Sequence, residues 1–370
     1  MTTLPSPSPA GTGLAVQVDV AVIGAGQAGL SAGYHLQRRG LTPGRGYVIL
    51  DASPGPGGAW RERWPSLTLN TVNRVHDLPG LPFTDVVGTQ AGEVQASLAV
   101  PAYFAEYEQR YRLPVYRPVR VALVTPHGAR LRVEADRVTL SARGIINATG
   151  TWDAPYIPPY PGAERFRGRT LHTRDYRTAQ AFAGQHVVVI GGGISAVQLL
   201  DEISRVTDTT WVTRTPPVFR DGPFGEEAGR AAVRLVEDRV RAGLPPNSVV
   251  SVTGLPVTPA VQAMRARGVL RRQEMFSEIT EDGVRWPDGR TLRADVLLWC
   301  TGFRSALDHL APLMLRGEDG GIVMTGRLAT QAARDPRVHL VGYGPSASTI
   351  GANRAGAAAA AELLEFLKRP

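Results

Sequence analysis

Two glycine-rich segments, each lying between an apolar run and a helical pattern, constrain the fold of this chain more than any other feature. The first is GAGQAG at residues 24–29, which follows the apolar run VDVAVI. A β-branched run of that kind is typical of a strand buried on both faces of a parallel sheet. In the order strand, loop, helix, Gly24 permits a tight turn, Gly26 lets the backbone approach a pyrophosphate, and Gly29 lets the helix pack against the strand. The segment predicts a dinucleotide site, with the plain alternative that the glycines only form a turn.

Two further features favour a nucleotide beside this loop. The next predicted strand, GYVILD, ends in Asp51, whose carboxylate can accept hydrogen bonds from an adenosine ribose. The segment after it is too rich in glycine and proline for a helix. The backbone at Gly57 and Gly58 can lie against a cofactor, and Trp60 and Trp64 can cover a flat ring. A surface loop with packed tryptophans is the alternative for that segment.

The second glycine segment repeats the pattern and predicts a second dinucleotide. The run HVVVI precedes GGGISA, in which Gly191, Gly193 and Ala196 occupy the fingerprint positions. Ser195 lies at the start of the predicted helix, near the expected phosphates, and we include it among the binding candidates. The next strand, TTWVTR, ends in Arg214, which can pair with a ribose 2′-phosphate. We therefore expect NADPH, with NADH as the second option and an ordinary exposed arginine as the alternative.

Two different dinucleotides in one chain are typical of enzymes that pass a hydride from a nicotinamide to a flavin. We expect an α/β fold with two Rossmann-like dinucleotide-binding domains, the NADPH domain being inserted into the FAD domain. The expected order is a disordered lead-in at 1–17, the first part of the FAD domain at 18–160, the NADPH domain at 161–290, and the second part of the FAD domain at 291–370.

Strand-like runs that end in small residues mark the expected seams between these domains. RGIINATG leads to Thr149 and Gly150, and ADVLLWCTG leads to Gly302. A third run, RVHLVG, precedes a helix that we expect to begin near Ser348 and Thr349, and its N-terminus can stabilise negative charge on a reduced flavin. These five residues are further cofactor-binding candidates. Plain N-capping is the alternative for the last two.

Composition argues against several other classes of protein. The chain of 370 residues has no apolar run of about 18 residues, which a membrane helix needs, and its start lacks the pattern of a secretory signal. Cys300 is the single cysteine, so an intramolecular disulfide, a CxxC pair and a thiolate zinc site are excluded; we expect no metal and a cytoplasmic location. The net charge is +8, but the arginines are scattered, so we expect no nucleic-acid partner. A nucleotide-sensing or nucleic-acid-binding module is the alternative from a different class.

The ordered motifs resemble the flavin-containing monooxygenase family over nearly the whole chain after residue 17. They are GAGQAG, the GGAW loop, NATGTW, FRGRTLHTRDY, GGGISA and CTGF, and the most specific is Phe166-x-Gly168-x-x-x-His172-x-x-x-Tyr176. The resemblance implies that NADPH reduces FAD, that reduced FAD and O2 form a C4a-hydroperoxyflavin, and that a small soft nucleophile, a sulfide or an amine, takes the distal oxygen. The protein then supplies positioning, exclusion of water and hydrogen bonds.

The resemblance also implies catalytic roles for four residues. Asn70 lies where many family members place an asparagine beside the reactive flavin carbon, and its amide can donate to the peroxide. Arg174 is common in the family. We expect His172 and Arg174 to form hydrogen bonds across the seam and Tyr176 to pack it, so that the connector sets the approach of nicotinamide to flavin.

Several alternatives and one departure remain. Many related flavoproteins have Gly-Asp in the last strand–loop, whereas this chain has Gly342-Tyr343, so backbone N–H groups or Ser346 are the candidates for that contact with the ribityl chain. A Baeyer–Villiger monooxygenase acting on ketones shares the same intermediate, and an uncoupled NADPH oxidase keeps every motif. A flavin disulfide reductase has the same plan but needs a dithiol. The oligomeric state stays open, a homodimer included.

Overall fold

The computed structural model describes residues 16–72, 75–89, 91–221, 226–246 and 254–369. The chain divides into two compact units. Unit 1 comprises Met1–Thr151, Val233–Asn247 and Ser305–Pro370, and unit 2 comprises Trp152–Ala232 and Ser248–Arg304. The predicted disordered lead-in lies outside the described residues except for its last two positions, which already belong to the first strand.

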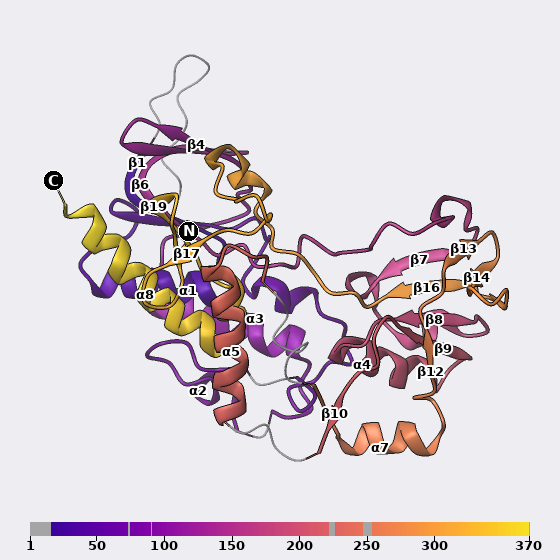
Figure 1. Ribbon diagram of the computed structural model, residues 1–370. Coiled ribbons are helices and arrows are strands. Elements are labelled where there is room, and N and C mark those ends of the chain that lie inside the picture. The colour runs from indigo at the N-terminus through magenta and orange to yellow at the C-terminus, as the bar shows by residue number, and fades with distance from the viewer. Residues whose placement is uncertain (1–15, 73–74, 90, 222–225, 247–253, 370) are drawn as a thin grey trace. The chain divides into compact units, whose positions relative to one another are not determined.

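A nine-stranded sheet forms the centre of the described part of unit 1 (Figure 1). Its parallel strands run in the order β19–β6–β1–β2–β3. Their bounds are β19 Asp335–Leu340, β6 Thr139–Asn147, β1 Val16–Ile23, β2 Tyr47–Leu50 and β3 Val115–Tyr116. Antiparallel strands extend the sheet, namely β17 Met324–Thr325, β18 Gln331–Ala332, β4 Val121–His127 and β5 Arg130–Ala135. The last residues of β1, β2 and β6 are all buried, as expected for strands covered on both faces.

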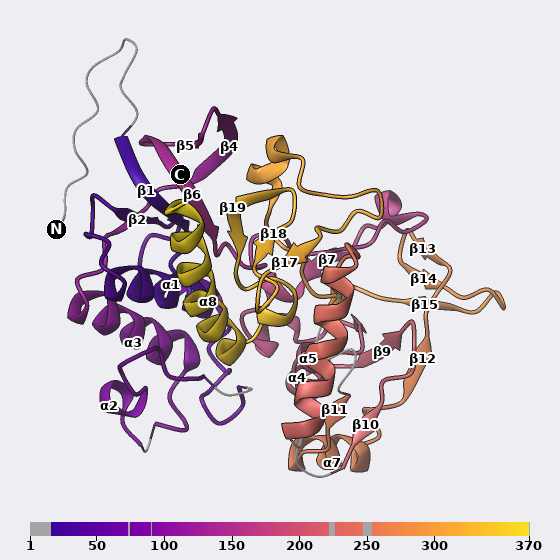
Figure 2. The ribbon, with the colours of Figure 1, turned by 60° about the vertical axis from the view of Figure 1, so that its left-hand side comes forward.

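Helices complete unit 1. Those outside the segment Val233–Asn247 are α1 Gln27–Arg38, α2 Thr84–Val87, α3 Ala96–Arg110 and α8 Thr349–Leu367, with short 3₁₀ turns η1 Gly58–Glu62, η5 Asp308–Leu313 and η6 Gly344–Ser346. Helices α1 and α8 lie side by side in both views (Figures 1 and 2). Their backbones are so close that a Cβ added to Gly356 would be 2.8 Å from the backbone nitrogen of Ala32. The small residues of α8 therefore allow this helix to pack closely against α1.

Unit 2 is built on a second parallel sheet, in which the described strands run in the order β12–β9–β8–β16–β7. Their bounds are β12 Arg272–Glu274, β9 Thr209–Thr213, β8 Val187–Ile190, β16 Val296–Trp299 and β7 Arg169–His172. The helices with this sheet are α4 Ile194–Ile203 and α7 Pro259–Ala266. Smaller pairings complete the unit: β10 Phe219–Arg220 with β11 Leu255–Pro256, and the antiparallel β13 Glu278–Thr280, β14 Gly283–Arg285 and β15 Thr291–Arg293.

The two units repeat one topology. The order β6–β1–β2–β3 in unit 1 corresponds to β16–β8–β9–β12 in unit 2. In unit 1 the strand β1 leads through a glycine loop into α1, and in unit 2 the strand β8 leads through a glycine loop into α4. The α/β fold with two Rossmann-like units is confirmed.

Helix α5 (Glu226–Arg241) lies in the middle of the span 161–290 that was predicted as the NADPH domain, yet its residues from Val233 on belong to unit 1. Val236 and Val240 are buried, and Val240 shares a core with Ile322 and Tyr343. The valine stripe, spaced by four residues, shows that this helix needs an apolar partner. The spacing does not say which partner, so only the packing reveals that it is the C-terminal part of unit 1.

Candidate functional site

The first glycine loop is fitted between two strand ends in unit 1. Gly24 has φ +100°, and a Cβ added there would be 2.5 Å from the carbonyl oxygen of Ala148. The Gly24 N–H donates to Leu50 O at 2.7 Å, and the Ala148 N–H donates to Ile23 O at 2.7 Å. The loop therefore lies where β1 ends, held by the ends of β2 and β6. Only glycine combines this φ with so close an approach.

The second glycine loop has the same arrangement in unit 2. Gly191 has φ +140°, and an added Cβ would be 2.3 Å from the carbonyl oxygen of Cys300. The Gly191 N–H donates to Val212 O at 2.9 Å, and the Cys300 N–H donates to Ile190 O at 2.7 Å. The NATG and CTGF motifs therefore have equivalent positions. NATG lies at the end of β6 and CTGF follows β16, and each contacts the glycine loop of its own unit.

The middle glycine of each loop has no such packing reason. Gly26 and Gly193 are the N-caps of α1 and α4, with φ −79° and −96°, and neither makes a side-chain capping bond. A Cβ added to either would meet no atom within 4 Å in the part of the chain that the structure describes. Free N–H groups at a helix N-terminus bind phosphate oxygens, and a missing Cβ lets the phosphate come close. The residues present therefore fit a dinucleotide pyrophosphate at each loop.

The remaining fingerprint positions differ between the loops. A Cβ added to Gly29 would be 1.8 Å from Gly24 O, so glycine is required there by packing alone, whereas the second loop accommodates Ala196. Ser195 lies beside it in the first turn of α4 and is half-buried. Gly150 and Gly302, which follow the two strand ends, have φ +63° and +79°.

The GGAW segment lies against the first loop. It forms the 3₁₀ turn η1, and a Cβ added to Gly58 would be 3.1 Å from Gly26 Cα. Trp60 packs at the edge of the core of α1 and α3. Trp64 is only 2% exposed and lies inside unit 1. Of the two tryptophans that were considered as cover for a flat ring, Trp60 is therefore the more accessible.

A hydrogen-bond chain that sequence reasoning missed fixes Thr149. The His309 Nε2–H donates to Asn147 Oδ1 at 2.7 Å, and Asn147 Nδ2 donates to Thr149 Oγ1 at 2.9 Å. The Thr149 hydroxyl then donates to Ala306 O at 2.7 Å. Burial lowers the pKa of His309 to about 4, so this ring is neutral near pH 7. The chain ties η5 to the end of β6.

The candidates at the last strand–loop make local bonds. Ser348 is the N-cap of α8 and accepts the Gly351 N–H at 3.1 Å, and Thr349 is the first residue of the helix. The Ser346 hydroxyl donates to Tyr343 O at 2.8 Å and is 4% exposed, so it serves its own turn. A binding role for Ser348 and Thr349 stays a prediction.

The connector FRGRTLHTRDY contains strand β7 of unit 2, and His172 is the last residue of that strand. The His172 Nε2–H donates to Gly302 O at 2.9 Å, and Nδ1 accepts the Arg174 N–H at 3.1 Å. Phe303 meets the ring edge-on, with the ring centroids 4.8 Å apart. Burial lowers the pKa of His172 and favours the neutral tautomer that these two bonds require.

An aromatic and charged cluster surrounds this histidine within unit 2. The Arg174 guanidinium pairs with Asp153 at 3.2 Å and lies over the Trp152 ring. Trp152 stacks on Phe303, with the ring centroids 5.1 Å apart. Residues of the NATGTW segment, the connector and the CTGF motif therefore meet at the carboxyl ends of β7 and β16.

The other two predicted catalytic residues lie elsewhere. Tyr176 is 1% exposed, stacks on Phe182, and donates to Glu202 on α4 at 2.6 Å. Asn70 is exposed on unit 1, and its Nδ2 donates to Glu93 at 2.8 Å. The structure thus gives Tyr176 a packing position and Asn70 an accessible one, while their catalytic roles stay predictions.

Arg214 directly follows β9 and is exposed. Sequence reasoning missed Arg272, which contacts the last residue of the same strand. Arg272 Nε donates to Thr213 Oγ1 at 2.7 Å, and one of its terminal nitrogens donates to Thr213 O at 3.3 Å. A Cβ added to Gly192 would be 3.7 Å from Thr213 Cγ2. Two arginines therefore lie at the strand end nearest the second glycine loop. The segment 216–280 has no motif that could have revealed the second.

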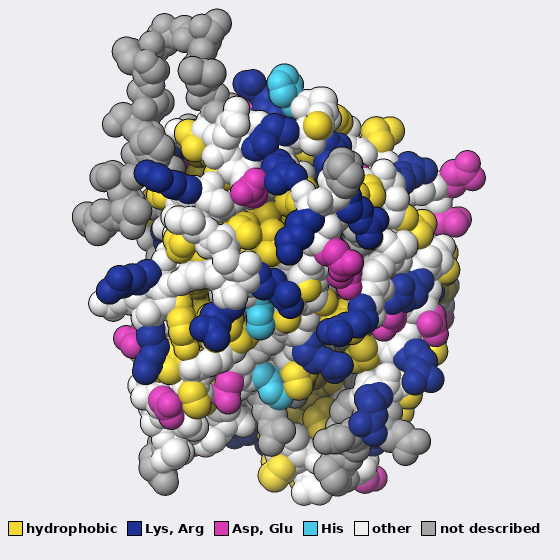
Figure 3. Space-filling model, turned by 90° about the vertical axis from the view of Figure 1, so that its left-hand side faces the viewer, with side chains coloured by type: hydrophobic (Ala, Val, Ile, Leu, Met, Phe, Trp, Pro, Cys, Tyr) yellow, Lys and Arg dark blue, Asp and Glu magenta, His cyan; other side chains and the backbone are white. Residues whose placement is uncertain are grey.

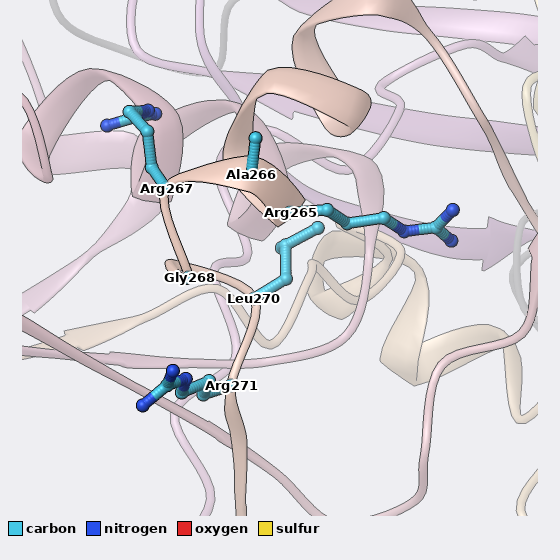
Figure 4. Close-up of a pocket in the computed structure, with 6 residues that line it drawn as sticks. All are labelled: Arg265, Ala266, Arg267, Gly268, Leu270 and Arg271. Atoms are coloured by element: carbon cyan, nitrogen blue, oxygen red, sulfur yellow. The ribbon is translucent and has the colours of Figure 1, made fainter.

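Other surface features of the described residues suggest no second kind of site. No group of acidic, histidine or cysteine side chains among them could hold a metal, and none of the helices that the structure describes is long and apolar enough to cross a membrane. Lys and Arg side chains are spread over the face in Figure 3, with Asp and Glu among them. A depression of about 320 Å³ in unit 2 is lined by Arg265, Arg267 and Arg271, but their guanidinium groups point in different directions (Figure 4).

Comparison with known proteins identifies the family. A family model described as pyridine nucleotide-disulphide oxidoreductase matches residues 21–223. The solved structure of a flavin-containing monooxygenase from Stenotrophomonas maltophilia is 39% identical in sequence, with a TM-score of 0.79, and the match covers 95% of this chain and 99% of that one. The chain belongs to the flavin monooxygenases, within that wider family.

Two curated proteins show the range of relatives of this flavin monooxygenase. The indole-3-pyruvate monooxygenase YUCCA1 of Oryza sativa subsp. japonica is 28% identical over 77% of this chain and 76% of its own length. A Baeyer-Villiger monooxygenase of Streptomyces coelicolor is 29% identical over 54% of this chain and 38% of its own length. The names of these two relatives describe monooxygenases of different kinds.

Alanine substitutions in the first loop separate ligand contact from packing. Gly26→Ala has room for its Cβ and an ordinary φ, so the variant should lose bound flavin but unfold at the thermal midpoint of the flavin-free wild-type protein. Gly24→Ala should unfold at lower temperature, because its strained φ and clash with Ala148 cost at least about 1–3 kcal/mol. Differential scanning fluorimetry and flavin absorbance measure both. Full flavin content in folded Gly26→Ala would contradict a phosphate at this position.

Replacing His172 tests the connector. His172→Ala removes the bonds to Gly302 and Arg174, so flavin reduction by NADPH should slow by about tenfold or more while flavin stays bound. His186→Ala is the matched control, since His186 lies at the start of β8 and bonds to Thr210. Stopped-flow loss of flavin absorbance measures the rate. Equal rates in the two variants would remove His172 from this role.

Proposed function

We propose that this flavin monooxygenase holds FAD at the first loop and NADPH at the second, and oxygenates a sulfide or an amine with O2. When bound, the flavin supplies the chemistry: it takes a hydride from the nicotinamide and passes one oxygen atom of O2 to the substrate, the other leaving as water. The observation that carries the proposal is the pair of uncapped helix N-termini at Gly26 and Gly193, with open space where a Cβ would lie. A flavin disulfide reductase would need a second thiol beside the single Cys300, which is buried.

The charges that follow β2 and β9 support the assignment of FAD to the first loop and NADPH to the second. Asp51 at the end of β2 suits ribose hydroxyl groups and repels a phosphate, which fits FAD. Arg214 and Arg272 at the end of β9 attract a 2′-phosphate, which fits NADPH. Because Arg272 is held by Thr213, its cation is oriented before NADPH arrives, which lowers the entropy cost of binding.

Within this proposal the residues of the chain bind, orient and exclude water. The N–H groups of α1 and α4 hold the phosphates, and the neutral His172 keeps Gly302 and Arg174 in place. The buried Cys300, whose pKa burial raises to about 12, stays a thiol and takes no part. Asn70 is the candidate donor toward the oxygen that is transferred. A cytoplasmic location agrees with the single cysteine.

Ketones are the second candidate substrate class, because one relative is a Baeyer-Villiger monooxygenase. The purified protein should be yellow with bound FAD, and its NADPH consumption should rise with a thioether or a tertiary amine and give the sulfoxide or N-oxide. Ester formed from a cyclic ketone would favour the second candidate. NADPH consumption that yields only H2O2 with every substrate would overturn both in favour of an oxidase, and absence of flavin after reconstitution would overturn the whole proposal.

The coenzyme assignment has its own test. Arg214→Gln and Arg272→Gln should each raise the KM for NADPH by about tenfold, because a charged hydrogen bond to the 2′-phosphate is worth about 1.5–3 kcal/mol, and should leave the KM for NADH nearly unchanged. Arg265→Gln is the control, since Arg265 lies on Phe219 on the same unit. Steady-state kinetics with both coenzymes measure the effect. Equal changes for NADPH and NADH would refute a phosphate contact.

A further inference from the structure

A buried arginine bridges two carboxylates at the end of the first nucleotide strand. Arg117 follows β3, and its two terminal nitrogens donate to the two oxygens of Glu108 at 2.6 and 2.9 Å. Its Nε donates to Asp51 Oδ2 at 3.1 Å, and one terminal nitrogen lies 3.1 Å from the same oxygen. The three side chains are only 11% to 13% exposed. One cation is therefore shared by two buried acids.

This arrangement is unfavourable as a purely structural device. Two carboxylates and one guanidinium leave a net negative charge in a site of low exposure, and burying ions costs several kcal/mol that a well-packed apolar trio would avoid. Burial raises the pKa of Glu108, although its bonds to Arg117 oppose that change. Packing alone does not require these three charged side chains, so we infer that one of them contacts a ligand.

The geometry also determines which atom is left for a ligand. Oδ2 of Asp51 accepts from Arg117, and no residue in the described part of the chain donates to Oδ1. Since Arg117 is locked by a two-pronged bond to Glu108, the Asp51 carboxylate cannot rotate freely. Oδ1 therefore stays in one orientation as an acceptor.

We propose that Arg117, held by Glu108, is a positioning residue that orients Asp51 to accept the hydroxyl groups of the adenosine ribose of FAD. This inference rests on the proposed function, which assigns FAD to the first loop. Arg117 does not contact FAD in this account. It acts through Asp51, by holding Oδ2 of that carboxylate so that Oδ1 is left to accept from the ribose.

Helix α3 connects this trio to the phosphate end of the same site. Glu108 is in its last turn, and Pro101 lies near its middle. A Cβ added to Gly57 would be 2.6 Å from Pro101 Cγ, and Gly58 in turn lies against Gly26. One helix thus supports both the loop at the pyrophosphate and the arginine behind the ribose acceptor, which accounts for the position of Glu108 on it.

The test compares FAD release from purified holoenzymes carrying Arg117→Gln, Asp51→Asn, both changes together, or Arg110→Gln. Fluorescence of the freed flavin after dilution gives the release rate, and back-titration with FAD gives the Kd. Arg110 is the matched control, because it lies on α3 and pairs with Glu106 at the surface. Binding of NADP⁺ to each variant reports on the second loop and detects general damage.

Arg117→Gln should weaken FAD binding by about tenfold or more, and the double variant should bind FAD no more weakly than Asp51→Asn alone. Arg110→Gln and NADP⁺ binding should not change. Losses from the two single changes that multiply in the double variant would overturn the inference, as would wild-type affinity in Arg117→Gln. If that variant does not fold, Arg117→Lys keeps the charge without the two-pronged bond and should still release FAD faster. A wild-type protein without FAD would instead refute the proposed function.

Discussion

The contact between each glycine loop and the neighbouring strand end is the constraint on which both nucleotide sites depend. Gly24 against Ala148 and Gly191 against Cys300 come closer than any side chain permits, and in both units backbone hydrogen bonds hold the loop on either side. This contact directs the following helix so that its N-terminus faces the carboxyl ends of the strands, where ligands of parallel sheets bind. A Cβ on the middle glycine would meet no described atom within 4 Å, and this is the space that we propose a phosphate occupies.

We propose that charge adapts the same backbone plan to two different dinucleotides. In unit 1 the strand β2 is followed by Asp51, which accepts a hydrogen bond from Arg117. In unit 2 the corresponding strand β9 is followed by Arg214, and Arg272 donates to Thr213 at the end of that strand. The connector is a further feature of unit 2, because the neutral His172 ring donates a hydrogen bond to Gly302 O in the CTGF turn. The glycine loops, the charges after the strands and the connector do not specify a substrate. This agrees with relatives that are named as different kinds of monooxygenase.

The parts of the site that depend on short stretches of sequence could be predicted, and the parts that depend on distant contacts could not. The loops, Asp51, Arg214 and the start of α8 belong to local patterns of strand, glycine and cap. The structure has the expected strands and helices around them, while the binding roles of these residues stay predictions. Arg117 is separated from Asp51 by 66 positions, and His309 from Asn147 by 162. Neither pair has a local signature. The packing of α5 against unit 1 could not be predicted from the sequence either, because an apolar helix face does not identify the surface that it packs against.

The measurement that tests the account most directly is the fate of labelled oxygen. The purified protein is supplied with NADPH, ¹⁸O2 and a thioether, and the sulfoxide is analysed by mass spectrometry together with the NADP⁺ formed. We predict that each sulfoxide molecule carries one ¹⁸O atom and that its amount approaches that of the NADPH consumed. NADPH consumption with H2O2 as the sole oxygen product, or sulfoxide whose oxygen comes from water, would contradict a monooxygenase built on these two sites.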